Sequence, residues 1–172
     1  MRLQYAQVNS SKVAAVLAII WHSRTGAAQA MAEAAHAAAR DKSHLLPAGA
    51  VTAEQLLTAS GYLFVCPENL ASMSGAMKEM FDCCYYPLLG QVEGRPYATA
   101  IAAGSDGRGA QAQIDRIAKG WRLRRVAEPL IVNLGAQTPQ EILAQKHVFP
   151  ADLAHCAKLG EALAEGIALG IY

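Results

Sequence analysis

Short apolar runs alternate with helix-forming segments along this chain of 172 residues. The predicted strands are Val13–Ile20, Tyr62–Cys66, Tyr97–Ala103 and Glu128–Leu134. The first three are almost uniformly apolar, which is typical of strands that are buried on both faces. Strands that alternate with helices connect as right-handed βαβ units in a parallel sheet. We therefore predict an α/β fold, a three-layer α/β/α sandwich around a five-stranded parallel sheet.

The segments between these runs are predicted to be helices. Gly26–Arg40 is rich in alanine, the strongest helix former, and Ala76–Tyr86 carries apolar residues at helical spacing. Pro150 suits the first turn of a C-terminal helix. The remaining predicted elements are helices at Ala110–Lys119 and Ala151–Leu169, a short strand at Ser43–Leu46 and a capped helical segment at Thr52–Leu57.

Length and charge narrow the class of protein. A chain of this length fits one domain, residues 1–172, in which residues 1–12 are an extension ahead of the first strand. The net charge of +1 supplies no large field to attract nucleic acid or an anionic membrane. The one basic cluster, Arg122, Arg124 and Arg125, is expected to be a solvated strand end.

The cysteines and the N-terminal apolar run bear on the compartment. Cys66, Cys83, Cys84 and Cys156 lack the spacing of metal ligands, and the adjacent pair cannot form an unstrained bridge in a helix. We therefore expect no metal site and a reduced, cytoplasmic protein. Lys12–Trp21 has the length of a signal-peptide core and is too short to span a bilayer. The segment before it is long and polar, so we favour a central strand.

The loops that follow the three strongest strands form one predicted site. Parallel strands end at the same edge of a sheet, and ligands of such folds bind beyond that edge. The three loop sequences are HSRTGAA, PENLASMSG and GSDGRG. We expect them to lie together in space.

The first loop has the features of a phosphate site. Ser23 and Thr25 carry hydroxyl groups, and Gly26 lets a ligand approach the backbone. The predicted helix that follows presents free N–H groups and a partial positive charge at its start. Arg24 either adds charge or lies outside the site. An ordinary helix cap explains the same residues equally well, and no P-loop or dinucleotide fingerprint is present.

The second loop has the mixture of groups that suits a flat heteroaromatic ring. Glu68 and Asn69 offer polar groups to a ring edge, and Leu70 and Met73 offer apolar contacts to its faces. The alternative is a loop in which Ser74 caps the next helix while the two apolar side chains fill core. The third loop adds close backbone approach and polar side chains at Gly104, Ser105 and Asp106.

The three loops, taken in order, resemble those of the flavodoxin-like flavoproteins. The motifs are SRTG before an alanine-rich helix, PENLASMSGAMKEMFD after a strand and AGSDGRGA after the next strand, and the resemblance covers Val13 to Leu134. It is strongest to the NAD(P)H-dependent FMN reductases and related quinone reductases. The resemblance implies FMN as cofactor and a homodimer or higher homo-oligomer, because open flavin sites in this family are commonly completed across a subunit interface. It places the FMN phosphate on Ser23, Arg24, Thr25, Gly26, Ala27 and Ala28, and the isoalloxazine ring beside Pro67, Glu68, Asn69, Leu70, Met73, Gly104, Ser105 and Asp106.

Two departures from related families shape the functional expectation. Ala28 stands where the family's phosphate loop often has a hydroxyl residue, so one hydrogen bond, worth ~1.5–3 kcal/mol if charge-assisted, is missing. The affinity for FMN is therefore expected to be modest. Electron-carrying flavodoxins are acidic and stack aromatic residues on the ring, whereas this chain is near neutral and has no aromatic residue in its second loop.

We therefore expect an NAD(P)H-dependent reductase of quinones or other small acceptors that works by ping-pong hydride transfer. NADH or NADPH gives a hydride to flavin N5, the oxidised pyridine leaves, and the acceptor takes the electrons. Backbone N–H groups near the pyrimidine edge of the ring stabilise the anionic reduced flavin, so no catalytic side chain is required. Two alternatives are an FMN electron carrier that serves a protein partner and a scaffold that has lost flavin, which Ala28 would explain.

Other chemistries have less support in the sequence. Cys66 follows a strand, as a phosphatase nucleophile can, but no arginine stands six residues further on. The first strand is not followed by the acidic residues of a phospho-receiver. His22 either touches a ligand or simply ends a strand. Tyr85 and Tyr86 are expected to pack in the core and on the surface rather than to line a substrate pocket.

Overall fold

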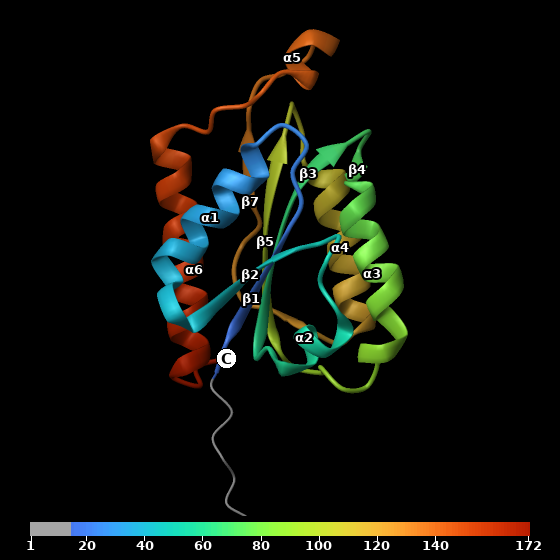
Figure 1. The fold of residues 1–172 in the computed structure, drawn as a ribbon, viewed down its shortest axis with the longest axis vertical. Helices are drawn as coiled ribbons and strands as arrows, with labels where there is room; N and C mark the ends of the chain where they lie inside the picture. The colour runs from blue at the N-terminus through green and yellow to red at the C-terminus, as the bar shows by residue number, and fades with distance from the viewer. Residues whose placement is uncertain (1–14) are drawn as a thin grey trace, which may run out of the picture.

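The computed structural model describes residues 15–172, in which strands and helices alternate as predicted (Figure 1). The predicted extension 1–12 and the first residues of the predicted strand Val13–Ile20 lie outside the described residues. The strands are β1 (Leu17–Trp21), β2 (Ser43–Pro47), β3 (Gly61–Asn69), β4 (Ser72–Met73), β5 (Pro96–Ala103), β6 (Arg124–Arg125) and β7 (Leu130–Asn133). The helices are α1 (Ala27–Ala39), the 3-10 turn η1 (Arg40–Lys42), α2 (Ala53–Thr58), α3 (Gly75–Leu88), α4 (Arg108–Gly120), α5 (Pro139–Leu143) and α6 (Pro150–Ala168).

The strands form one mainly parallel sheet in the order β2-β1-β3-β5. Beyond β5 the edge is shared, because β6 pairs with the beginning of β5 and β7 pairs with its end. The predicted five-stranded parallel sheet is thus confirmed, with its last position split between two short strands. Among the strands of residues 15–172, β4 is the one that runs antiparallel, and it folds back onto the end of β3.

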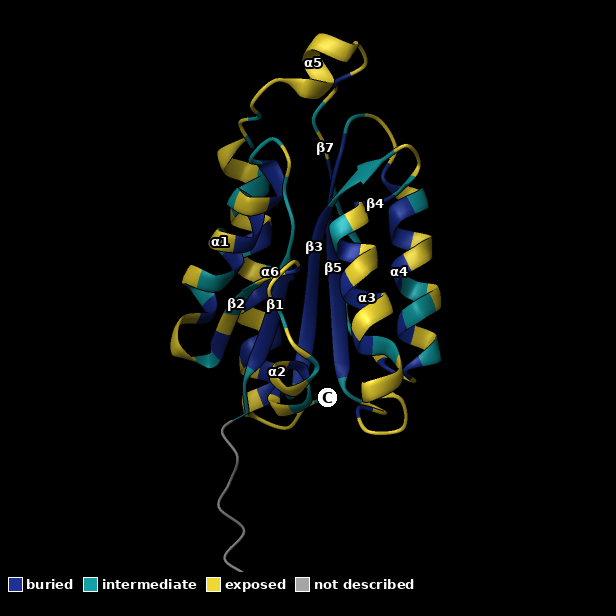
Figure 2. Ribbon diagram, turned by 45° about the vertical axis from the view of Figure 1, so that its right-hand side comes forward, coloured by how far each residue is buried: buried dark blue, intermediate teal, exposed yellow. Residues whose placement is uncertain are grey.

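Helices cover both faces of this sheet, which confirms the three-layer sandwich. Helices α1 and α6 pack on one face, and α2, α3 and α4 pack on the other (Figure 1). Successive residues of β1 alternate between the two cores, with Ile19 facing α1 and α6, and Ile20 facing α2, α3 and α4. Strands β1, β3 and β5 are buried on both faces, as Figure 2 shows. This burial explains their almost uniformly apolar sequences.

β3 is longer than the sequence predicted. We expected it to end at Cys66, because the following Pro67 cannot donate a ladder hydrogen bond. The strand instead continues to Asn69, with Pro67 in register with Ala102 of β5. The neighbouring β1 ends opposite Val65, so the proline has an open side and its missing N–H costs no ladder bond. The predicted loop PENLASMSG is therefore a β3–β4 hairpin.

The side chain of Glu68 ties this hairpin to the start of α4. Its carboxylate accepts hydrogen bonds from the backbone N–H groups of Gly107 at 2.8 Å and Ala110 at 3.0 Å. The N-cap of α4 is Gly107, which has φ 89° and no side chain to cap the helix. A carboxylate at this position also meets the positive end of the helix dipole. Glu68 thus fixes the second and third loops against one another.

All four cysteine thiols are free, and three of them are buried. Burial raises the pKa of the Cys66 thiol to about 12 and that of the Cys156 thiol to about 11. Cys83 is exposed on α3, and its Sγ donates a hydrogen bond to Glu79 at 3.6 Å. In the described part of the chain, no helix is long and apolar enough to cross a membrane.

Replacing Glu68 by alanine should lower the free energy of unfolding by about 2 kcal/mol, because two N–H groups at a helix N-terminus lose a charged acceptor. Glu68→Gln keeps one acceptor oxygen and should cost about half as much. Urea unfolding followed by circular dichroism measures both values. Equal stability of the wild type and the alanine variant would show that this carboxylate does not hold the loops together.

Under native conditions, a thiol reagent should modify one cysteine per chain, and mass spectrometry should place the label on Cys83. Cys66 and Cys156 are buried with strongly raised pKa values, so both thiolate formation and access to the reagent are blocked. All four cysteines should react after unfolding. Rapid labelling of Cys66 in the native protein would contradict the packing at the end of β3.

Candidate functional site

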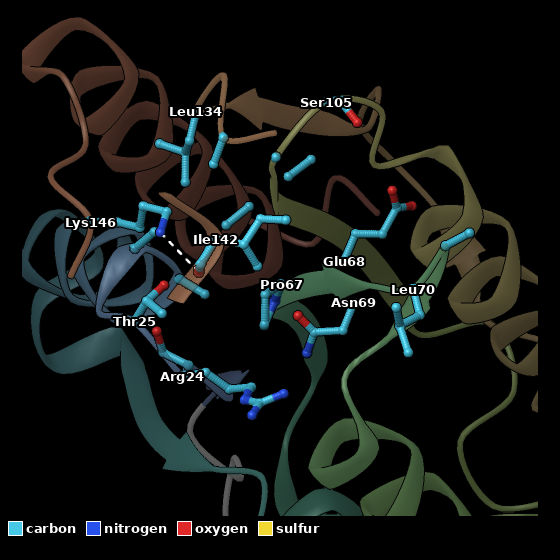
Figure 3. A pocket seen from close by; sticks show the side chains of 18 residues that line it. Arg24, Thr25, Pro67, Glu68, Asn69, Leu70, Ser105, Leu134, Ile142 and Lys146 are labelled. Atoms are coloured by element: carbon cyan, nitrogen blue, oxygen red, sulfur yellow. Dashed lines mark hydrogen bonds between the residues drawn. The ribbon is translucent and has the colours of Figure 1, made fainter. Parts of the chain in front are cut away.

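The loops after β1, β3 and β5 meet at the carboxyl edge of the sheet and line one pocket of about 370 Å³. β1 lies between β2 and β3 in the sheet. The chain therefore passes from β1 to its neighbour β2 on one side, and then crosses to β3 on the other side of β1. Such a topological switch point leaves a crevice between the diverging loops. The structure therefore brings the three predicted loops together (Figure 3). Eleven of the fourteen predicted residues line this pocket: Ser23, Arg24, Thr25, Ala27, Ala28, Pro67, Glu68, Asn69, Leu70, Gly104 and Ser105.

The other three predicted residues, Gly26, Met73 and Asp106, are not among the residues that line the pocket. Gly26 is the N-cap of α1, with φ 91°. The hairpin turns Met73 back into the core, where it is 3% exposed. Asp106 lies on the surface and pairs with Arg108 at 3.6 Å.

One end of the pocket is formed by the first turn of α1. The N-cap Gly26 makes no side-chain hydrogen bond to the helix, and the first backbone bond inside it runs from Ala30 N–H to Gly26 O at 3.0 Å. The N–H groups at positions 27–29 therefore have no partner within the helix. Ser23 Oγ accepts the N–H of Gly26 at 3.0 Å, which orders the loop and leaves the hydroxyl proton available to a ligand.

Arg24 and His22 lie around this loop in different ways. Arg24 extends toward Asn69 rather than toward the helix start (Figure 3). His22 is absent from the pocket lining, and its Nδ1 lies 2.9 Å from Oγ of Ser74, the N-cap of α3. Burial and the charge of Arg24 lower the pKa of His22, which favours the neutral ring. His22 thus connects the first loop to the helix that follows the second.

The hairpin provides the opposite wall of the pocket. Asn69 extends into the pocket, whereas the carboxylate of Glu68 points toward α4, which it caps (Figure 3). Each carboxylate oxygen of Glu68, which the sequence assigned to a ligand, therefore already accepts one hydrogen bond within the protein. Leu70 at the hairpin tip is fully exposed, and Leu70 and Ala71 both have positive φ, at 51° and 57°. Such values are strained for side chains of this type.

Seven lining residues were missed by the sequence analysis. Two of them end β5, one lies at the hairpin tip, and the others follow β7. The rule that sites lie beyond the carboxyl ends of strands applies equally to β7, and Thr138 with Glu141 is a recognisable capping box. These two signals could have shown that the loop after β7, together with α5, belongs to the site. The missed residues are Ala71, Ala102, Ala103, Leu134, Ala136, Ile142 and Lys146.

The chemistry of the lining favours binding over covalent catalysis. The eighteen lining residues include no histidine, cysteine or aromatic residue. No group of three or more potential metal ligands occurs within residues 15–172. The pocket offers a helix start, hydroxyl and amide groups, and small apolar surfaces. It can therefore orient a bound molecule, and its hydroxyl groups have no histidine in the lining to act as a general base.

Comparison with known proteins supports this assignment of the fold. The sequence profile of a family described as NADPH-dependent FMN reductase matches residues 32–137. This segment covers the second and third loops and begins inside α1, after the first loop. No curated protein sequence gives a significant match.

Solved flavodoxin structures share the arrangement of strands and helices. A flavodoxin from the domain Archaea has a TM-score of 0.70 at 16% identity, covering 88% of this chain and 97% of that one. A flavodoxin, WrbA-like protein from Agrobacterium tumefaciens has a TM-score of 0.68 at 17% identity, covering 90% and 98%. Two-electron reduced Megasphaera elsdenii flavodoxin has a TM-score of 0.67 at 17% identity, covering 87% and 99%. Because the family profile also matches more than half of the chain, this protein has the flavodoxin-like fold and belongs to the NADPH-dependent FMN reductase family.

Proposed function

We propose that the protein binds FMN in this pocket and uses NAD(P)H to reduce a quinone or another small acceptor. The observation that carries the proposal is the start of α1, whose unpartnered N–H groups open into a pocket walled by the two loops of the family match. A helix N-terminus is suited to a phosphate group. The pocket thus has one anion-binding end and one end of mixed polarity.

The first loop would hold the phosphate of FMN. The backbone N–H groups of Ala27, Ala28 and Gln29 lie at the positive end of α1. The hydroxyls of Ser23 and Thr25 add two donors beside them. Ala28 supplies only its N–H, so this loop has one donor fewer than it would have with serine at that position.

The second and third loops would hold the isoalloxazine ring. Asn69 and Ser105 bring polar groups to the pocket, while Pro67 and Ala103 bring small apolar surfaces. When bound, FMN supplies two-electron chemistry, in which NAD(P)H loses a hydride to become NAD(P)⁺ and a quinone gains two electrons and two protons to become a hydroquinone. The task of these residues is to orient the ring and to exclude competing reactions.

The lining favours a reductase over an electron carrier. It contains no aromatic side chain that would cover a ring face, so a flat donor and a flat acceptor could occupy the same face in turn. An electron carrier docks on charged partners and benefits from a charged surface, whereas this chain has a net charge of +1. An FMN carrier without its own NAD(P)H oxidation is the alternative. A scaffold without flavin is the second alternative.

A homo-oligomer and a cytoplasmic location stay predictions. The free thiols agree with a reducing compartment. Exposed apolar side chains at Leu70 beside the pocket, and at Leu169 and Ile171 near the C-terminus, provide apolar surface that a second subunit could cover. Analytical ultracentrifugation of the purified protein would give the oligomeric state.

Titration of the purified protein with FMN, followed by quenching of flavin fluorescence, should give saturable binding of one FMN per chain. Ala28→Ser should tighten binding about tenfold, because it adds a hydroxyl donor to a charged acceptor. Ala30→Ser places the same hydroxyl on α1 outside the pocket lining and should leave the affinity unchanged. Absence of binding at tens of micromolar FMN would contradict the proposal.

Steady consumption of NADPH should occur when the FMN-loaded protein is mixed with a small quinone, and double-reciprocal plots should give the parallel lines of a ping-pong reaction. NADPH oxidation followed at its absorbance maximum measures the rate. The control is the same mixture without added FMN and with flavin-free protein. Tight FMN binding without NADPH or NADH oxidation would favour the carrier instead.

A further inference from the structure

The segment that follows α5 lies across the phosphate end of the pocket. The backbone N–H of Lys146 donates to the carbonyl oxygen of Thr25 at 2.7 Å. The side chain of Gln145 rests on Gly26, where an added Cβ would collide with its amide group. Residues more than 100 positions apart in the sequence are thus in direct contact at the start of α1. We name residues 144–149 the strap.

The side chain of Lys146 connects the strap to the pocket. It lines the pocket together with Thr25 and Ile142 and is only partly exposed (Figure 3). Its ammonium group donates to the backbone carbonyls of Glu141, of Ile142 at 3.0 Å and of Ala144 at 2.6 Å. All three acceptors are uncharged carbonyls at or just beyond the end of the short helix α5.

Lys146 is one of two cations in the pocket lining, and its backbone is bonded to Thr25 at the predicted phosphate end. Only Arg24 and Lys146 among the lining residues carry a positive charge, and Arg24 extends toward Asn69 (Figure 3). An ammonium group forms much stronger hydrogen bonds with a phosphate than with a neutral carbonyl. An anion bound at the start of α1 would therefore compete effectively with the carbonyls for the Lys146 ammonium.

We propose that Lys146 makes this pocket selective for the phosphorylated flavin, FMN, over riboflavin. The inference rests on the proposed function and deepens it, because it assigns the discrimination between two ligands with the same ring to one side chain. Lys146 lies beyond residue 137, the end of the family match, so the fold rather than the matched sequence places it at the site. Its role is that of a specificity-determining residue, because the ring chemistry does not involve it.

Lys146 also caps α5, and this structural role gives a different expectation for its removal. Loss of the cap would loosen α5 and with it Ile142, which lines the pocket. This change would affect any ligand in the pocket, with or without a phosphate. Affinity for FMN and riboflavin would then fall by the same factor. Loss of a charge beside the phosphate would weaken only FMN, because riboflavin has no phosphate.

The experiment compares the dissociation constants of FMN and riboflavin for the wild type and for Lys146→Met, Lys146→Arg and Lys158→Met, each measured by fluorescence quenching. Lys146→Met should raise the dissociation constant of FMN at least about tenfold and that of riboflavin by less than about twofold. Lys146→Arg keeps the charge and should restore most of the preference for FMN. Lys158→Met removes an exposed charge from α6, outside the pocket lining, and should change the dissociation constant of neither ligand. Raising the salt concentration should weaken the binding of FMN more in the wild type than in Lys146→Met.

Three other outcomes would overturn the inference. Equal weakening of FMN and riboflavin in Lys146→Met would show that the lysine only caps α5. An unchanged affinity for both ligands would show that it does not reach the phosphate. A wild type that binds neither ligand would refute the proposed function and this inference with it, whereas the first two outcomes leave FMN binding by the wild type intact.

Discussion

The structure depends on one unsatisfied group of backbone donors. The first turn of α1 presents the N–H groups of residues 27–29 to the carboxyl edge of the sheet, and Gly26 caps it without a side chain. Burying such donors without a partner would cost about 1–3 kcal/mol for each. The fold leaves this turn at one end of a pocket instead, where an anion can satisfy the donors. α4 shows the contrasting solution, because Glu68 already satisfies the start of that helix.

The remainder of the fold keeps the start of α1 in place and separates it from the pocket wall that the β3–β4 hairpin forms. Burial of β1, β3 and β5 on both faces fixes the positions where their loops begin. His22 of the first loop contacts Ser74, the N-cap of α3. Glu68 of the second loop binds the start of α4. Each of these loops is thus tied to a helix that follows a different loop. The strap lies against the first loop from outside, since the backbone N–H of Lys146 is bonded to Thr25. Binding groups from distant segments are thus held by contacts that do not involve the ligand.

Much of the fold could be predicted from the sequence, because apolar runs indicate buried strands and their alternation with helices indicates a parallel sheet. The three-layer sandwich, the strands β1, β2, β5 and β7, and the helices α1, α2, α3, α4 and α6 follow from local pattern. The extent of β3 did not follow, because tolerance of Pro67 depends on where the neighbouring strand β1 ends. The roles of Glu68 and Lys146 did not follow either. Their partners are 39 or more positions away for Glu68, and the contact of Lys146 with Thr25 exists only in the folded chain.

The most direct test of the central claim is a ¹H–¹⁵N spectrum of the labelled protein during titration with FMN. Phosphate binding at the start of α1 should produce the largest amide shifts at Thr25 to Gln29. The amides of α2, which packs on the face of the sheet opposite α1, should move little. Shifts that spare residues 25–29, or that centre on another part of the surface, would show that the free turn of α1 is an ordinary helix end and not the anchor of the ligand.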